Sequence, residues 1–336
     1  PYINTHAEYP GMKRVQFDMV TSPDPHETRR RQILDEFPEV KTLMTIEPRT
    51  KYYIAINILL QLVAITYAVT IEDMQTFFVF AYVVGGTLSH SLFLAIHELS
   101  HNTAFKSMAH NQYMAIAANL PIGVPYASSF RRYHLQHHYR LGQELDTDIP
   151  SELESWLVSY SATCYLDHVL RKTLYLSMYT VVYALRPVIM RPEVMKYDYW
   201  FFANLAAQCV FDVGVVVCLG WKGLWFMLVS TFLAGSLHPL SGRFLSEHLL
   251  LTEGQETYSY YGKFNNMLWQ IGRHVEHHDF PNIPFTKLPK LTEIAGKHYA
   301  EPAKTSSWSE TTLQFIFDDG LGPHQRIRRE LASKAD

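Results

Sequence analysis

The chain has 336 residues, of which 48% are hydrophobic and 14% aromatic, and its formal net charge is −3. This near-neutral balance includes no dominant basic stripe, so we expect no nucleic-acid partner. The three cysteines, Cys164, Cys209 and Cys218, form no C-x-x-C pair. That pattern excludes a disulfide scaffold and thiolate metal sites, and it fits a reducing, cytosolic environment.

Two long uncharged segments follow a polar and charged stretch that covers residues 1–50. We expect that stretch to form short amphipathic helices at the cytosolic face. Residues 52–71 and 74–97 contain no Asp, Glu, Lys or Arg, and each segment is long enough to cross a bilayer. Because only two acidic residues separate the segments, they are predicted to form a membrane hairpin.

A second uncharged pair occupies residues 199–221 and 223–242, on either side of Lys222. Asp212 interrupts the first segment of this pair. Since a charge in mid-membrane is costly, we expect Asp212 to face other helices, and we assign it no catalytic role. The pair predicts a second membrane hairpin.

The distribution of Lys and Arg predicts how the membrane domain, residues 51–336, is oriented. The two hairpin connections hold one basic residue between them, whereas the flanking segments are rich in Lys and Arg. By the positive-inside rule, both termini and residues 98–198 and 243–336 face the cytosol. Shorter apolar stretches at 114–126 and 170–190 are predicted to be re-entrant or interfacial. The expected fold is an all-α integral membrane protein with four transmembrane helices in two hairpins and a cytosolic helical cap.

Eight of the 17 histidines fall into three tight groups. The first, in "AIHELSHNTAF", matches the H-E-x-x-H signature of zinc proteases. The second and third share the pattern H-x-x-H-H. On a helix, positions i, i+3 and i+4 share one face, so each triplet is predicted to aim its imidazoles at one point. The eight residues are His97, His101, His134, His137, His138, His274, His277 and His278.

All three groups lie at or beyond the predicted cytosolic ends of the membrane segments, so they can converge on one side of the bilayer. Eight imidazoles are too many for a single catalytic zinc, which takes three protein ligands. Two metal ions with open positions fit eight or nine nitrogens better. Neutral imidazole suits iron, copper and zinc, and we expect a redox site with two metals. Glu98 is then expected to hold a ligand ring rather than to act as a hydrolytic base. Four further carboxylates are candidates for the same role: Glu276, Asp279, Asp146 and Asp148.

A ninth ligand is expected near the end of the fourth segment, where His238 and His248 are candidates. We favour His248, because it lies just beyond the predicted membrane edge. His90 is seven residues from His97 and on the same helical face, which suggests at most a peripheral role. The other histidines are expected to have no part in the site: His6, His26, His110, His168, His298 and His324.

The order of the three histidine boxes and the two hydrophobic hairpins resembles the membrane fatty-acyl desaturase and hydroxylase superfamily. Within it, the chain resembles the sphingolipid delta-4 desaturases. The stretches that carry this closer resemblance are "HETRRRQILDEFPEVKTLM", "ANLPIGVPYASSFRRYHLQHHYRLG", "ETYSYYG" and "HVEHHDFPNIP".

The resemblance implies an endoplasmic reticulum enzyme with two iron ions, bound by the eight box histidines, with His248 as the candidate ninth ligand. It implies that O₂ and two electrons from a cytochrome b5 type donor and its reductase are consumed. The implied substrate is dihydroceramide in the bilayer, which would gain a trans double bond between carbons 4 and 5. No "HPGG" haem signature occurs in the sequence, so the electron donor is expected to be a separate protein.

One residue departs from the expected family pattern. Arg243 stands where the resemblance leads us to expect a histidine, and a guanidinium offers only donors, so it cannot bind a metal. Arg243 is therefore expected either to weaken the second iron site or to lie beside lipid phosphate.

Four other functions remain open at this stage: a C4-hydroxylase or dual enzyme, a straight-chain acyl desaturase, an intramembrane zinc protease, and a non-enzymatic scaffold. The first would use the same iron site. The protease would need one zinc and only one ligand beyond His97 and His101, with Glu98 as its base.

Overall fold

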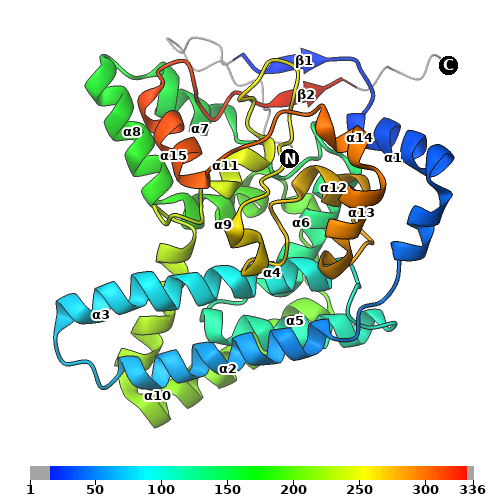
Figure 1. Cartoon of the computed structure of the whole chain (residues 1–336). Helices are drawn as coiled ribbons and strands as arrows, with labels where there is room; N and C mark the ends of the chain where they lie inside the picture. Colours follow the sequence, from blue (N-terminus) through cyan, green and yellow to red (C-terminus); the bar gives the residue numbers. More distant parts are fainter. Residues whose placement is uncertain (1–15, 331–336) are drawn as a thin grey trace.

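The structure, a computed structural model, describes residues 16–330. Long helices form the lower part of the molecule in Figure 1, and shorter helices form a layer above them. In chain order the elements are β1 Asp18–Val20, α1 Pro25–Glu36, α2 Thr50–Ala68, α3 Met74–Phe80, α4 Thr87–Ser100, α5 Met108–Asn119, α6 Ala127–Tyr139, α7 Glu152–Ser155, α8 Tyr165–Ser177, α9 Tyr179–Met190, α10 Tyr199–Ala234, α11 Arg243–His248, α12 His274–Asp279, α13 Leu288–Ile294, α14 Gly296–Ala300, α15 Trp308–Phe317 and β2 Ile327–Arg329.

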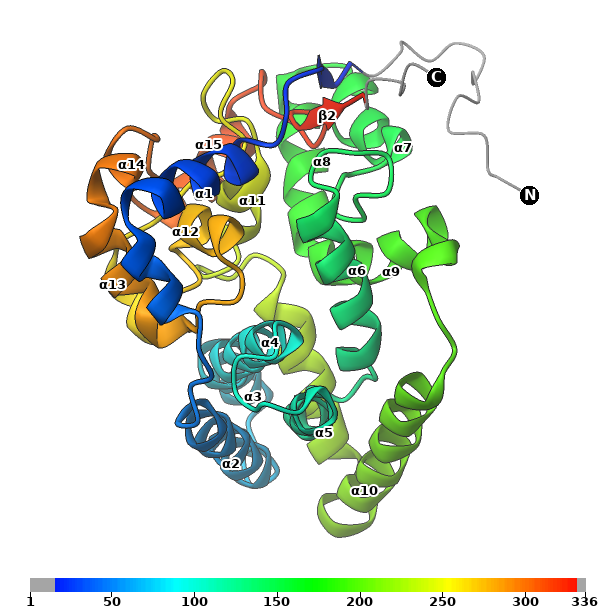
Figure 2. The same cartoon turned by 90° about the vertical axis from the view of Figure 1, so that its right-hand side faces the viewer.

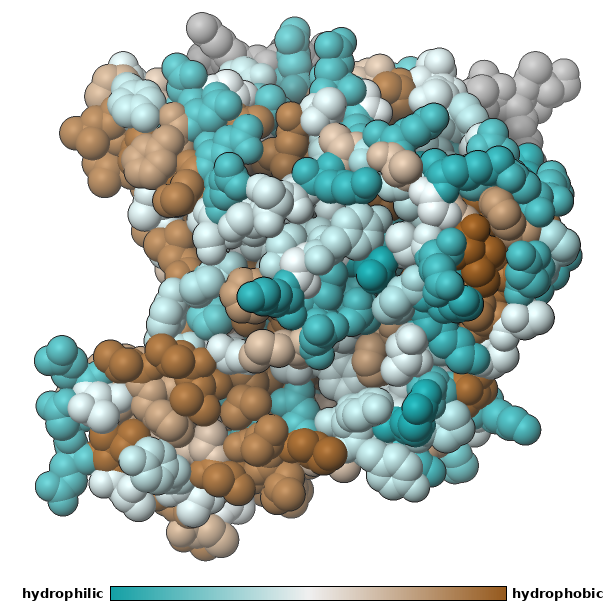
Figure 3. Space-filling model, viewed as in Figure 1, coloured by the Kyte–Doolittle hydropathy of each residue, from teal (hydrophilic) through white to brown (hydrophobic). Residues whose placement is uncertain are grey.

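Three helical stretches of the described chain are long and apolar enough to cross a membrane: α2 with 19 residues, Met74–Ser100 with 27, and α10 with 36. The first two match the predicted segments 52–71 and 74–97 to within a few residues. Large apolar side chains are exposed along α2 and α10, and in Met74–Ser100 between Met74 and Val83. They give the hydrophobic surface at the lower left of Figure 3, which is the surface that a bilayer would cover.

The predicted third and fourth segments both lie in α10, which breaks at Gly220, where φ is 75° and ψ is 176°. Glycine takes this positive φ without steric cost. Figure 2 shows the two halves of α10 as the arms of a V. The predicted end of the fourth segment at residue 242 was wrong, because the helix ends at Ala234 and turns follow. Hydropathy measures only apolarity, and Pro239 lacks the N–H that a continuing helix would need.

The break in α10 lies beside the connection between α2 and α3. The Lys222 ammonium donates to the carbonyl oxygens of Val69, at 3.1 Å, and Ile71. Further up, α10 packs closely against a π-helical turn, Ala81–Gly86, that joins α3 to α4. A Cβ atom at Gly85 would lie 2.0 Å from the Ser230 hydroxyl, so the close approach requires glycine there.

The two shorter apolar stretches have different structures. Residues 114–126 begin in α5, which packs against α4 and α10. Residues 170–190 lie in α8 and α9, which meet at a bend of 74° and together could form a broken span or a re-entrant loop. Leu166, Leu170 and Leu174 form an exposed apolar stripe on α8. That stripe fits the predicted interfacial position.

The polar layer contains the only strands of the described chain, which the all-α prediction omitted. β1 and β2 pair in parallel, with Asp18 opposite Ile327 and Val20 opposite Arg329, and they lie side by side at the top of Figure 1. Three-residue strands have too little alternation to be recognised from sequence. The pairing brings the two ends of the described chain together.

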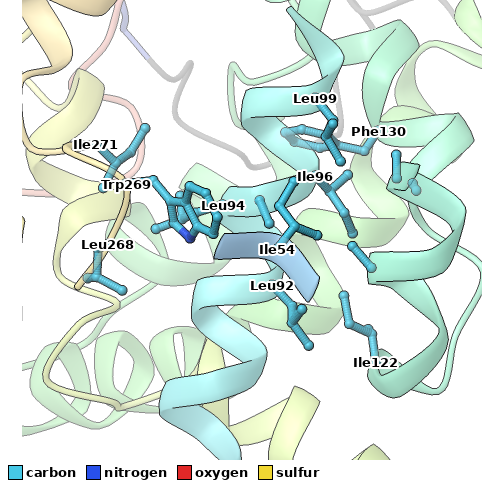
Figure 4. Packing of buried hydrophobic residues seen from close by; sticks show 14 of the residues in the cluster. Ile54, Leu92, Leu94, Ile96, Leu99, Ile122, Phe130, Leu268, Trp269 and Ile271 are labelled. Carbon is cyan, nitrogen blue, oxygen red and sulfur yellow. The ribbon is translucent and has the colours of Figure 1, made fainter. Parts of the chain in front are cut away.

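α4 is the central helix, and every residue from Leu94 to Ser100 is buried. Figure 4 shows its apolar side chains packing between α2, α6 and the loop that carries Leu268 and Trp269. This packing fixes the C-terminal end of α4, where the first histidine box lies.

Candidate metal centre and its cavity

The box histidines converge in two adjacent groups. In the first group, His97 and His101 at the end of α4 meet His134 and His138 of α6 and His277 of α12. One ligand nitrogen from each residue lies within 4.8 Å of those from the others. Three pairs of Nε2 atoms are especially close: 2.9 Å for His101 and His134, 3.1 Å for His134 and His138, and 3.2 Å for His138 and His277.

The second group joins His137 of α6, His248 of α11 and His278 of α12 within the same limit. The Nε2 atom of His248 is 3.0 Å from that of His137 and 3.1 Å from that of His274, so His274 also belongs here. The choice of His248 over His238 is thus supported by position.

Each H-x-x-H-H box serves both groups, contrary to the prediction that each would aim at one point. Positions i and i+4 lie about 40° apart around a helix, whereas i+3 turns to the other side. On α6, His134 and His138 therefore face the first group and His137 the second. On α12 the division is reversed, since His274 and His278 face the second group and His277 the first.

The geometry of both groups fits a metal ion. Metal–nitrogen bonds of about 2.1 Å at right angles place neighbouring nitrogens about 3 Å apart, as the close Nε2 pairs here lie. Nitrogens of two neutral imidazoles this close, without a proton between them, need a cation to share. Moreover, His97 Nε2 and His278 Nε2 are buried without a hydrogen-bond partner in the described chain, which leaves both free to bind a metal.

Burial keeps most of these rings in the neutral form that binds metals. Desolvation, followed by repulsion from neighbouring imidazoles, lowers the pKa of His134, His138, His248, His274 and His278 well below the ordinary value. It lowers the pKa of His277 to about 3.

Of the nine histidines, His137 alone has a carboxylate partner in the described chain, Asp146. Burial alone would lower its pKa, but the Asp146 carboxylate raises it on balance. Asp146 Oδ1 is 2.8 Å from His137 Nδ1 and accepts the backbone N–H of Asp148, while its Oδ2 accepts that of Gly142. Asp146 thus fixes the ring so that Nε2 points at the second group, as expected for a residue that orients a ligand.

The same expectation was wrong for the other carboxylates. Glu98 accepts hydrogen bonds from the Thr103 hydroxyl and the Phe285 N–H, and from no histidine of the described chain. Asp148 pairs with Arg326. Glu276 accepts the hydroxyls of Ser259, Tyr261 and Thr292, so it ties α12 to its surroundings. These carboxylates are near the histidines in sequence, but the direction of each side chain decides which residue it contacts.

Asp279 also holds no ligand. Instead it binds Arg29 through both carboxylate oxygens and lies 2.7 Å from His26 Nδ1. Sequence reasoning excluded His26, yet its buried ring lies 5.0 Å from that of His278. Only tertiary packing of α1 on α12 brings it there, and no local pattern around His26 indicates this position. His6 lies outside the described residues, and the structure places His110, His168, His298 and His324 away from both groups.

A cavity of about 100 Å³ opens beside the two groups. His97 and His134 of the first group and His137, His248 and His274 of the second form part of its wall. Six aromatic side chains form a further part of the wall: Phe93, Tyr126, Phe130, Tyr179, Tyr183 and Phe244. Three charged residues complete the wall: Asp148, Arg243 and Glu247.

Arg243 is buried in this wall, which argues against the alternative that it lies beside lipid phosphate. Its Nε donates to His90 Nε2 at 2.8 Å, and one of its terminal nitrogens donates to Glu247. Burial raises the pKa of Glu247, and Arg243 partly offsets that effect. His90 was expected to be peripheral but lines the same cavity. His238 contacts His90 and Tyr82 rather than either histidine group.

Comparison with known proteins shows the family of the chain. The family model described as fatty acid desaturase matches residues 74–309, and that described as sphingolipid Delta4-desaturase matches residues 13–49. The chain is 39% identical to a sphingolipid delta(4)-desaturase DES1-like protein of Arabidopsis thaliana, over 99% of this chain and 97% of the relative.

Two further relatives come from distant organisms. The Homo sapiens sphingolipid delta(4)-desaturase/C4-monooxygenase DES2 is 39% identical over 94% of this chain and 95% of its own length. The Candida albicans sphingolipid delta(4)-desaturase is 40% identical over 94% of this chain and 88% of its own length. The chain therefore belongs to the fatty acid desaturase family, and within it to the sphingolipid delta(4)-desaturases.

Proposed function

We propose that the protein is a di-iron, O₂-dependent sphingolipid delta-4 desaturase that converts dihydroceramide to ceramide in the endoplasmic reticulum membrane. The observation that carries this proposal is the arrangement of two adjacent histidine groups in the wall of one cavity that is both aromatic and charged. The chain's similarity to sphingolipid delta(4)-desaturases of Arabidopsis thaliana and Candida albicans supports the same reaction.

The proposed ligands of one iron are His97, His101, His134, His138 and His277. Those of the other are His137, His248, His274 and His278. Iron fits these sites, because imidazole binds iron well and the bound metal must carry out redox chemistry. Because the second group has four imidazoles without any contribution from position 243, Arg243 does not deprive it of a necessary ligand.

In the reaction, two hydrogens leave carbons 4 and 5, and O₂ takes up these together with two electrons and two protons to form two waters. Bound iron supplies the oxidising power for the unactivated C–H bonds. The chain's own residues hold the iron ligands in place, as Asp146 does for His137. The aromatic wall of the cavity binds the sphingoid chain and orients carbons 4 and 5 toward the histidines.

The cavity wall also bears on the choice of substrate. In dihydroceramide the hydroxyl and amide groups occupy carbons 1–3, next to the reacting carbons. The polar groups must therefore lie in the same cavity as the metal ligands, and Asp148, Arg243 and Glu247 lie there. A straight-chain acyl desaturase acting far from its head group would need an apolar wall instead. The human relative is named as both a delta(4)-desaturase and a C4-monooxygenase, which supports C4-hydroxylation as a second candidate.

We propose that the histidine groups face the cytosol and that a separate cytochrome b5 type protein and its reductase deliver the electrons. Both connections between the long helices, at Glu72–Asp73 and at Lys222, lie at one end of the molecule. The flanks near the histidines carry Lys51, Arg131 and Arg132, which favour the cytosolic side.

The test is lipid mass spectrometry of cells that lack their own delta-4 activity. We expect ceramide two hydrogens lighter than its precursor with the intact chain and none with His137→Ala. His110→Ala is the matched control, because His110 is exposed and lies in neither group. A product that gains one oxygen would favour hydroxylation. One zinc per chain instead of two irons, with no lipid product, would favour the protease.

A further inference from the structure

We propose that Arg243 is a specificity-determining residue that binds an oxygen on carbons 1–3 of the sphingolipid substrate. This inference deepens the proposed function and rests on it. It starts from a residue that cannot bind metal and is nevertheless buried in the wall of the catalytic cavity.

The guanidinium is held rigidly on two sides. Its Nε–H donates to His90 Nε2, and the other ring nitrogen of His90 lies 2.9 Å from the carbonyl oxygen of Ala234 and donates to it. Because the Arg243 Nε–H can only donate, His90 Nε2 must accept, so His90 is neutral with its ring proton on Nδ1. One terminal nitrogen of Arg243 pairs with Glu247, and the guanidinium lies 4.0 Å from the centre of the Phe244 ring.

The remaining terminal nitrogen, Nη2, donates to no group in the part of the chain that the structure describes. An arginine has five N–H donors, and Arg243 lines the cavity. Its unused donors are therefore available to a molecule in the cavity. An arginine whose plane is fixed by two partners loses little entropy when it binds a third, which favours a specific contact.

The position of Arg243 fits the substrate's chemistry. His97, His134, His137 and His274 line the same cavity, so a chain whose carbons 4 and 5 face them has its oxygens a few bonds away. The 3-hydroxyl, the amide carbonyl and the 1-hydroxyl are all acceptors for N–H groups. A simple hydrocarbon chain at this point would leave the charged donor unpaired, which is costly.

The experiment uses the purified full chain with iron and an electron donor system, and it compares Arg243→Gln, Arg243→Lys and the unaltered chain. We expect Arg243→Gln to raise KM for dihydroceramide by about tenfold to a hundredfold, the range for one lost hydrogen bond to a charged group. Arg243→Lys should raise KM less, since it keeps the charge but loses the planar fork. For both variants kcat and iron content should stay close to those of the unaltered chain.

Substrate analogues identify the contact. We would use dihydroceramides that lack the 1-hydroxyl, the 3-hydroxyl or the amide carbonyl. For one analogue, KM of the unaltered chain should rise by the same factor as KM of Arg243→Gln rises with the full substrate. Testing Arg243→Gln with that analogue should raise KM little further. Thermal stabilisation by added dihydroceramide, measured without turnover, should fall in parallel. Arg171→Gln is the matched control, because Arg171 also forms an i,i+4 ion pair but does not line the cavity.

Two results would overturn the inference. One is loss of iron from Arg243→Gln, which would make Arg243 a support of the metal centre. The other is an equal loss of rate with every analogue, which would make its role merely structural. If the unaltered chain forms no ceramide at all, the proposed function itself fails. The iron content then shows whether the metal centre forms, and thermal stabilisation by dihydroceramide shows whether the cavity binds sphingolipid.

Discussion

Asp146→Asn should weaken metal binding at the second group while leaving the fold intact. The Asp146 carboxylate accepts three hydrogen bonds, from His137 Nδ1 at 2.8 Å, Gly142 N at 2.8 Å and Asp148 N at 2.9 Å. The amide oxygen of asparagine can keep the bonds on the Oδ1 side. Its NH₂ group then faces the Gly142 N–H, so one buried donor loses its acceptor, at about 1–3 kcal/mol.

The effect on the metal comes through His137. The variant removes the negative charge that orients this ring and increases its basicity, and such changes lower metal affinity by about tenfold to a hundredfold. Chelator competition, with iron measured by mass spectrometry, would detect the loss. Glu154→Gln is the matched control, because Glu154 is a largely buried carboxylate that pairs with Arg186 and contacts no candidate ligand. The reasoning is refuted if Asp146→Asn binds iron like the unaltered chain, or if Glu154→Gln loses as much.

Three further predictions concern stability. Gly85→Ala should destabilise the packing of α10 by about 1–3 kcal/mol and lower the melting temperature, because its Cβ would lie 2.0 Å from the Ser230 hydroxyl. Gly214→Ala is the control, because nothing lies within 4 Å of a Cβ there. Its melting temperature should equal or exceed that of the unaltered chain. Asp279→Asn should loosen α1 by breaking a buried ion pair with Arg29, at about 3–5 kcal/mol, and limited proteolysis within α1 should become faster; unchanged cleavage would contradict this. Removal of iron by a chelator should lower the melting temperature, and Fe²⁺ should restore it; a melting temperature insensitive to iron would argue against a bound metal.

The sequence identified the residues of the site better than it predicted their arrangement in space. Spacing identified the three boxes, the predicted membrane edge favoured His248 as a ninth histidine, and the structure places all nine in two adjacent groups. The spacing did not show that each H-x-x-H-H box divides between two groups. Its three positions span about 100° around the helix, so their side chains can reach two centres that lie on either side of that face. The division depends on how α6 and α12 lie relative to the two groups, which is a tertiary arrangement.

Residues that act through tertiary contacts were beyond the reach of sequence patterns. His26 and His90 carry no local motif, yet one lies against His278 and the other holds Arg243. The same holds for the helix ends. Residues 235–242 are apolar enough to extend a membrane segment, but turns replace the helix after Ala234. Apolar periodicity reports burial or lipid exposure, whereas the backbone conformation depends on Gly and Pro at particular positions.

The most direct test of the account is to measure metal content and product on one purified sample of the full chain. We predict two irons per chain, one iron in His101→Ala and in His248→Ala, and ceramide from dihydroceramide only where both irons are present. A single zinc per chain, or sphingolipid desaturation that survives loss of either histidine group, would contradict it.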